Sequence, residues 1–160
     1  MRTELVSIPT DTVPLDGAYH SPDGGHLKGG VLLMHGNQMN FYTGAPRFLP
    51  PYLTDLGYAC LAYNRRGHDT LTTRNSRAAV GGALQSAAEA LADNDYAAHF
   101  LAEQGYSEPI VIGHSNGGML AVQFAARHAE TRALVLLSAH RGGKDILRLA
   151  SKAGLAAQGE

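Results

Sequence analysis

A serine at the tip of a tight turn is the residue in this sequence best placed to act as a nucleophile. Gly113, Ser115 and Gly117 form a Gly-x-Ser-x-Gly pattern between the apolar run Pro109–Ile112 and a stretch without helix breakers that reaches His128. The pattern predicts a buried strand, a sharp turn and a helix, with the serine hydroxyl exposed at the bend. The two glycines leave room for the strand and the helix to approach each other.

Two other sites built on a glycine-rich turn are excluded by the residues at their defining positions. A dinucleotide-binding fingerprint requires glycine where Ser115 stands. A phosphate-binding loop requires glycine at Ser138 and serine or threonine at Asp145. The pattern therefore favours a nucleophile, and an ordinary strand-to-helix turn is the alternative.

The serine needs strands and helices that hold it, and the chain alternates the two. Apolar runs predict strands at Glu4–Pro9, Val13–His20 (with a bend at Asp16-Gly17), Gly30–Met34, Tyr58–Tyr63, Ile110–Gly113 and Ala133–Leu137. Helices are predicted at Ala45–Leu56 (interrupted early by Pro50-Pro51), Gly82–Gln104, Met119–Ala126 and Lys144–Ala156. In the helix Gly82–Gln104, an apolar stripe is expected at positions that include Ala87, Ala88, Ala98 and Leu101. Near-continuous apolar strands that alternate with helices indicate the α/β class, with a mainly parallel sheet of about six strands flanked by helices.

Composition narrows the class of protein. The 160 residues fit a single domain, 1–160, and the net charge of −1 gives no reason to expect nucleic acid or an anionic membrane as a partner. No segment has the length and apolar character of a membrane span or a signal peptide. Cys60 is the only cysteine and lies in an apolar run, so we expect neither a disulfide framework nor a thiolate metal site. A cytoplasmic location is the resulting expectation.

A serine nucleophile needs a base, a carboxylate that orients the base, and N–H donors for the developing oxyanion. In parallel sheets such groups lie at the carboxyl ends of strands. We expect the N–H of Asn116 to be one oxyanion donor, because it follows the nucleophile. The second donor is expected in the turn after Gly30–Met34, with the N–H of Asn37 as first choice and that of Gln38 as second.

Three segments in register resemble one family. Leu32–Asn37, Asn64–Asp69 and Gly113–Gly118 are similar to the oxyanion turn, the turn after the fourth strand and the nucleophile elbow of α/β-hydrolase fold proteins. The sequence therefore resembles the amino-terminal part of an esterase-like or lipase-like serine hydrolase, over residues from about 31 to 138. The resemblance implies hydrolysis of an acyl, ester-type bond in a small-molecule substrate, without a metal or organic cofactor.

The resemblance gives context to the histidines near the serine. His35, Gly36 and His114 are the candidate binding residues, although His35 is also suited to a structural role in its loop, and the His114 side chain is expected to point away from the serine. His68, together with Arg65, Arg66 and Asp69, is expected to stabilise its own turn, with a place at the substrate entrance as the alternative.

The chain departs from the family pattern after the nucleophile, where the family places first its acid and then its histidine. His128 is expected at a helix end, and His140 precedes Asp145 in the wrong chain order. Asp145 better suits a helix start, and a role as the acid, in a variant that places it after the sixth strand, is the alternative. The other acids after the serine are Glu130 and Glu160. We therefore expect the acid and the base beyond residue 160. The fold would be truncated, without its last two strands and its cap, and this form would be almost inactive alone.

Two further expectations follow from a shortened fold. A catalytically silent binding or interaction module, or an inactive fragment, is the alternative to an enzyme. The strand Ala133–Leu137 would lie unpaired at the sheet edge, where its apolar residues favour self-association.

Overall fold

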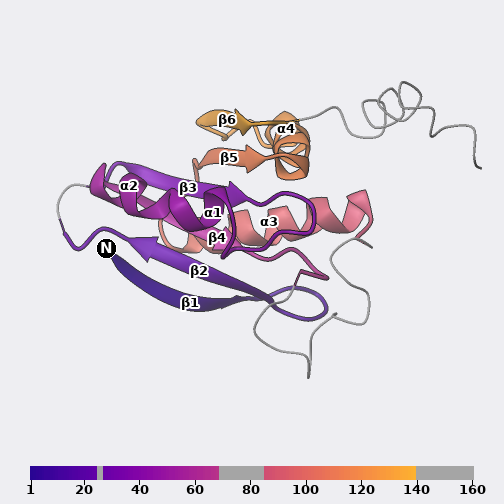
Figure 1. Ribbon diagram of the computed structural model, residues 1–160, viewed down its shortest axis with the longest axis horizontal. Coiled ribbons are helices and arrows are strands. Elements are labelled where there is room, and N and C mark those ends of the chain that lie inside the picture. Colours follow the sequence, from indigo (N-terminus) through magenta and orange to yellow (C-terminus); the bar gives the residue numbers. More distant parts are fainter. Residues whose placement is uncertain (25–26, 69–84, 140–160) are drawn as a thin grey trace, which may run out of the picture.

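The described residues form one six-stranded sheet in the strand order β1-β2-β4-β3-β5-β6 (Figure 1). The computed structural model describes residues 1–24, 27–68 and 85–139. The strands are β1 Arg2–Ile8, β2 Leu15–Ser21, β3 Gly29–Met34, β4 Tyr58–Tyr63, β5 Ile110–His114 and β6 Ala133–Leu137. Strands β4, β3, β5 and β6 run parallel, whereas β1 and β2 are antiparallel to their neighbours. The predicted α/β class with a mainly parallel sheet is confirmed.

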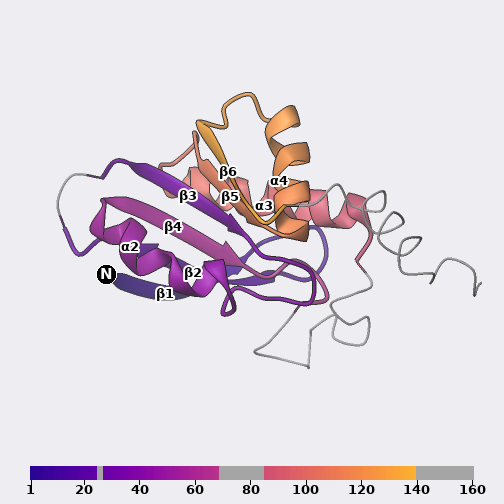
Figure 2. The ribbon, with the colours of Figure 1, turned by 45° about the horizontal axis from the view of Figure 1, so that its top comes forward.

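The two faces of the sheet carry separate apolar layers, because successive side chains of a strand point to opposite sides. Leu32 and Met34 of β3 join the layer beneath helices α3 (Ala87–Glu103) and α4 (Asn116–Arg127). Val31 and Leu33 join the layer covered by α1 (Ala45–Phe48) and α2 (Pro50–Asp55). Figure 2 shows these two helix pairs on opposite sides of the sheet. Burial on both faces explains why the central strands are continuous apolar runs.

Proline and glycine residues determine where two of the predicted elements are interrupted or continuous. The interruption predicted at Pro50-Pro51 divides the helix Ala45–Leu56 into two short helices, and the second begins at Pro50, where the fixed φ of proline suits a first helical position. The predicted bend at Asp16-Gly17 is wrong. Gly17 lies inside β2, where a side chain would meet the Ala62 carbonyl oxygen at 2.9 Å, so glycine is required for close strand pairing.

Helix α3 differs most from its prediction. It begins at Ala87, because the Ser86 side chain accepts a hydrogen bond from the Glu89 N–H and the Glu89 carboxylate accepts one from the Ser86 N–H. Ala87 and Ala88, expected in the apolar stripe, are exposed. The buried face of α3 instead includes two polar residues, Asp93 and Asn94, both with no exposed surface.

Several expectations lie outside the described residues: the helix Lys144–Ala156, the residues His140, Asp145 and Asp69, and the first part of the helix expected from Gly82. None of the helices in the described part of the chain combines the length and apolar character that crossing a bilayer requires. The same residues contain no group of three or more His, Cys, Asp or Glu side chains placed to hold a metal ion.

Strand β6 lies at the edge of the sheet and pairs only with β5 among the described strands. Leu134, Val135 and Leu136 are 37 to 44% exposed, which is unusual for a run without charge or proline. Such an edge offers both unpaired backbone groups and apolar side chains to another chain.

We predict that Val135→Lys reduces concentration-dependent self-association, because a charge on an edge strand opposes edge-to-edge pairing. Sedimentation velocity over a concentration series measures the effect. Val122→Lys on α4 is the matched control, since Val122 is 45% exposed and belongs to a helix and not to the edge strand. A wild-type chain that stays monomeric at high concentration would contradict the prediction, as would an equal effect of both variants.

Candidate active site

The turn after β3 and the turn after β5 lie against each other at the carboxyl edge of the sheet. Strands β3 and β5 pair in parallel, with Met34 opposite Gly113, so their carboxyl ends coincide. A Cβ atom on Gly36 would lie 3.3 Å from the Ser115 Cβ and 3.2 Å from His114 Nδ1. The structure thus brings together the two segments that the sequence predicts to form the site.

Ser115 adopts a backbone conformation that non-glycine residues rarely use. Its φ is 54° and its ψ is −118°, and it stands at the N-cap position of α4. Its N–H donates to the Leu137 carbonyl oxygen at 2.9 Å, and its own carbonyl oxygen accepts from the Gly118 N–H at 2.9 Å. Such a conformation costs on the order of 1–3 kcal/mol and persists only where its surroundings enforce it. The strained turn predicted for this serine is present.

The glycines on either side of Ser115 are required by contact with backbone. A Cβ on Gly117 would lie 2.4 Å from the carbonyl oxygens of Met34 and His35. A Cβ on Gly113 would lie 2.5 Å from the Gly117 carbonyl oxygen. Because backbone atoms cannot give way as flexible side chains can, the strand, the turn and the helix fit together only with glycine at both positions.

Three backbone N–H groups next to the serine are available to an acceptor. Among the described residues, no hydrogen bond engages the N–H of Asn37, Gln38 or Asn116. Asn116 is the first residue of α4, where the helix dipole favours negative charge. Gln38 has a φ of 54°, so the turn after β3 is itself constrained. Free donors at these positions are suited to hold an oxyanion that forms beside Ser115.

The Ser115 hydroxyl has no base within hydrogen-bond reach in the part of the chain that the structure describes. His35 is fully buried, and both of its ring nitrogens are engaged. His68 Nδ1 is paired with the Met39 carbonyl oxygen at 2.8 Å. The His114 ring lies against Gly36, and its buried Nδ1 has no partner among the described residues. These three histidines therefore surround the turns without acting on the hydroxyl.

His35 is held as a neutral imidazole. Its Nε2 accepts a hydrogen bond from the Arg65 N–H at 3.2 Å, so the ring proton belongs on Nδ1, which donates to the Gly36 carbonyl oxygen at 2.7 Å. Burial, together with the nearby positive charge of Arg65 and the His68 ring, holds the pKa of His35 well below its ordinary value of 6.5. The predicted alternative of a structural histidine therefore describes His35 better than direct binding.

The turn after β4 is stabilised by distant partners and not by its own residues alone. Arg66 donates from Nη2 and Nε to the Asp93 carboxylate at 2.6 and 2.9 Å, and its backbone N–H donates to the same group. Arg65 and Gln85 are joined by a hydrogen bond of 3.2 Å. The sequence did not predict that Gln85 and Asp93 belong to this region. The feature that could have indicated Asp93 is a carboxylate at a position of α3 that faces the sheet.

A small cavity of about 60 Å³ lies beside the free N–H groups. Asn37, Arg65 and Asn116 are among the residues that line it. It has room for a few atoms of a ligand and is far smaller than a pocket for a whole small molecule. The described residues thus form only a small recess at this corner of the sheet.

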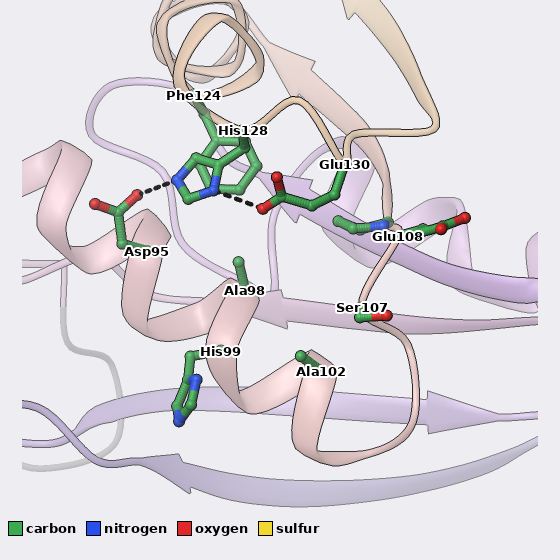
Figure 3. A pocket seen from close by; sticks show the side chains of 10 residues that line it. Asp95, Ala98, His99, Ala102, Ser107, Glu108, Phe124, His128 and Glu130 are labelled. Atoms are coloured by element: carbon green, nitrogen blue, oxygen red, sulfur yellow. Dashed lines mark hydrogen bonds and ion pairs between the residues drawn. The ribbon is translucent and has the colours of Figure 1, made fainter.

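A larger hollow, of about 500 Å³, lies at the opposite edge of the sheet, next to the amino end of β5 (Figure 3). There the His128 ring stacks on Phe124, with Nε2 paired to Asp95 at 3.0 Å and Nδ1 paired to Glu130 at 2.8 Å. Because both ring nitrogens are occupied, His128 cannot act as a base for Ser107, which lines the same hollow. His128 ends α4, as expected, and is remote from Ser115.

We predict that Gly117→Ala lowers the free energy of unfolding by about 3 kcal/mol, because the added methyl group would overlap two backbone carbonyl oxygens. Urea unfolding monitored by circular dichroism measures the change. Gly24→Ala is the control, since nothing lies within 4 Å of a Cβ built there. Equal stability of the two variants would show that the elbow and the β3 turn are not in tight contact.

We also predict that acid destabilises the protein through His35. The stabilising contribution of neutral His35 is fully present above pH 6.5 and is lost as the pH falls, because the unfolded chain then binds a proton that the folded chain does not. Each such proton adds a slope of about 1.4 kcal/mol per pH unit to the free energy of unfolding.

The variant His35→Gln should reduce this slope between about pH 6.5 and 5. His20→Gln is the comparison, because burial also lowers the pKa of His20, which is less buried than His35. Urea unfolding at a series of pH values gives the slopes. A His35→Gln protein with the wild-type slope would contradict a buried, neutral His35.

Several solved structures share the fold of this chain. A protein assigned as a dienelactone hydrolase from Klebsiella pneumoniae aligns with a TM-score of 0.71 and 19% identity, over 89% of this chain and 61% of that one. A dienelactone hydrolase from Anabaena variabilis gives 0.69 and 21%, over 96% and 79%. A cold-adapted esterase from an Arctic intertidal metagenomic library gives 0.65 and 24%, over 93% and 66%.

None of the curated protein sequences compared with the chain matches it. The model of the alpha/beta hydrolase fold family matches residues 30–156, which include the β3 turn, the β4 turn and the elbow. Because this match covers most of the chain, the protein belongs to the α/β hydrolase fold family.

Proposed function

We propose that this chain is the nucleophile-bearing part of a serine hydrolase that cleaves an ester-type acyl bond in a small molecule. The observation that carries the proposal is the position of Ser115. It stands on a strained turn at the carboxyl edge of the sheet, beside backbone N–H groups of Asn37 and Asn116 that have no other partner among the described residues. A strained turn has little use without a reacting side chain.

In the proposed reaction, the Ser115 hydroxyl oxygen attacks the carbonyl carbon of the substrate as its proton passes to a base. The carbonyl oxygen becomes an oxyanion, which accepts hydrogen bonds from the Asn116 and Asn37 N–H groups, with the Gln38 N–H as the second choice to Asn37. The carbon–oxygen bond to the leaving alcohol then breaks, and the alcohol takes the proton. Water attacks the acyl-enzyme, releases the acid and restores Ser115.

The proposal places the base and the acid that orients it beyond residue 160, in the family order of serine, acid and histidine. The absence of a base from the hydrogen-bond partners of Ser115 in the described part is consistent with this placement. Oxyanion donors alone leave a residual acceleration, so the 160-residue form should be a very poor catalyst. The dienelactone hydrolase and esterase names of its structural neighbours support an ester as the substrate class.

A second candidate is a catalytically silent module that uses the same corner for binding. It is favoured by the Ser115 hydroxyl, which has no hydrogen-bond partner within the described ranges, and by the small size of the adjacent cavity. The two candidates differ in one respect: the enzyme requires Ser115 itself, whereas a binding module tolerates its replacement.

A fluorophosphonate probe and p-nitrophenyl acetate test the proposal. A longer chain that supplies the later acid and histidine should react rapidly with both, and Ser115→Ala should lower its esterase rate by at least about 10³-fold. Ser107→Ala, at the opposite edge of the sheet, is the matched control and should retain the wild-type rate.

Two outcomes would contradict the proposal in different ways. Esterase activity of the longer chain that survives Ser115→Ala would remove Ser115 as the nucleophile. Rapid labelling of Ser115 in the 160-residue chain would show that a working base lies within it, and the proposed location of the base would then be wrong.

A further inference from the structure

A buried guanidinium group lies directly behind the turn that carries the Asn37 N–H. Arg65 is 1% exposed, and among the described residues its side chain hydrogen-bonds only to neutral groups: Nη1 donates to the His35 carbonyl oxygen at 2.9 Å, and Nε donates to Gln85 Oε1 at 3.2 Å. Burying a charge without a directly bonded carboxylate is costly, and an apolar side chain of similar volume would fill the space at lower cost. The position of Arg65 is therefore better explained by what it holds than by stability alone.

Arg65 holds the His35 residue at two points. Its Nη1 fixes the His35 carbonyl oxygen, and its backbone N–H donates to His35 Nε2. The second contact selects the ring tautomer that carries its proton on Nδ1, and Nδ1 in turn donates to the Gly36 carbonyl oxygen at 2.7 Å. The ring thus connects Arg65 to the next peptide unit of the turn.

That peptide unit contains the proposed oxyanion donor. The Gly36 carbonyl and the Asn37 N–H belong to one planar trans peptide, in which the two groups point in opposite directions. Once the His35 ring holds the Gly36 carbonyl, the direction of the Asn37 N–H is also fixed. On the other side of the turn, the His35 carbonyl oxygen lies so close to Gly117 that no Cβ fits between them. The turn therefore has little freedom to rotate.

A brace of two residues, Gln85 ahead of helix α3 and Asp93 on that helix, holds the guanidinium. The Gln85 side chain accepts from Arg65 and donates from Nε2 to Asp93 Oδ2 at 2.7 Å. Asp93 has no exposed surface and is also fixed by Arg66 through three hydrogen bonds. Because Gln85 is an amide, it bridges a cation and an anion that do not touch, and both keep a defined position.

We propose that Arg65 is a positioning residue for the oxyanion-binding peptide: through His35 it sets the direction of the Asn37 N–H, and Gln85 and Asp93 hold it in place. The inference rests on the proposed function only in that it takes the Asn37 N–H to be an oxyanion donor. The mechanical link from Arg65 to that N–H stands on the hydrogen bonds alone, so the two can be tested separately.

Nuclear magnetic resonance of the 160-residue chain tests the link without any activity. Long-range ¹H–¹⁵N spectra distinguish the protonated ring nitrogen of a histidine from the unprotonated one. In the wild type, the His35 proton should be on Nδ1 and exchange slowly. In Arg65→Lys, which keeps the charge but cannot reach both acceptors in the planar fork of arginine, this proton should exchange at least about tenfold faster, and the Asn37 amide signal should shift.

A milder variant and a control make the test decisive. Gln85→Met removes only the brace from a partly exposed residue ahead of α3, so it should fold and change the same signals in the same direction, by less. Tyr63→Phe removes a different buried hydrogen bond, that to Asn94 at 2.6 Å, and should leave the His35 and Asn37 signals unchanged. Folded Arg65→Lys and Gln85→Met proteins with wild-type His35 and Asn37 signals would overturn the proposal. If Arg65→Lys does not fold, Gln85→Met alone decides.

Kinetics of the longer chain test whether the position of the Asn37 N–H matters for catalysis. Arg65→Lys should lower kcat for p-nitrophenyl acetate by about tenfold to hundredfold with little change in KM, because a misdirected donor weakens binding of the transition state only. A wild-type kcat in Arg65→Lys, with Ser115→Ala inactive, would refute the positioning role and leave the proposed function intact. Activity that survives Ser115→Ala would refute the proposed function, whatever the spectra show.

Discussion

The closeness of the elbow to the turn after β3 is the constraint on which the rest of the structure depends. Carbonyl oxygens of Met34 and His35 occupy the space that a side chain at position 117 would need. The β5–α4 connection must therefore be as tight as glycine allows, and Ser115 is left with a positive φ. The hydrogen bond from its N–H to the Leu137 carbonyl oxygen ties the same turn to β6. Strain at one residue is maintained by three strands and one helix.

A second constraint is the polar network on the α3 side of the sheet. Arg65 and Arg66 follow the end of β4 after one intervening residue, and neither projects freely into solvent. Arg66 pairs with the fully buried Asp93, and the hydrogen bonds of that carboxylate raise the pKa of Arg66. Arg65, whose pKa burial lowers, is held by neutral acceptors. The network costs more to bury than an apolar core would, and it provides fixed directions that an apolar core cannot provide.

The sequence was sufficient for the parts of the fold that depend on local patterns. Continuous apolar runs identified the parallel strands, because strands buried on both faces have no polar alternation. The elbow was predictable because glycine spacing around a serine reports a steric requirement. The boundaries that failed, at Gly17 and at the start of α3, depend on which strand pairs with which and on a capping serine. Among the described residues, no base is hydrogen-bonded to Ser115.

The network around Arg65 could not be predicted, for a physical reason. Helical periodicity assigns apolar residues to the buried face of a helix and polar residues to the exposed face. It therefore predicts burial of Ala87 and Ala88 and does not predict the burial of Asp93. The pairing of Asp93 with Arg66 joins residues 27 positions apart and exists only once α3 packs on the sheet. The sequence showed an arginine-rich turn, and the fold gave each arginine its partner.

In the proposed enzyme, the turn after β3 and the elbow together form an oxyanion-binding corner around Ser115. The most direct measurement is a crystal structure of the chain after prolonged reaction with a fluorophosphonate, whose phosphoryl oxygen stands where the oxyanion would form. We expect a phosphorus bonded to Ser115 Oγ, with the phosphoryl oxygen about 2.7–3.1 Å from the backbone nitrogens of both Asn116 and Asn37. A phosphoryl oxygen that faces solvent, or one that contacts neither nitrogen, would contradict it.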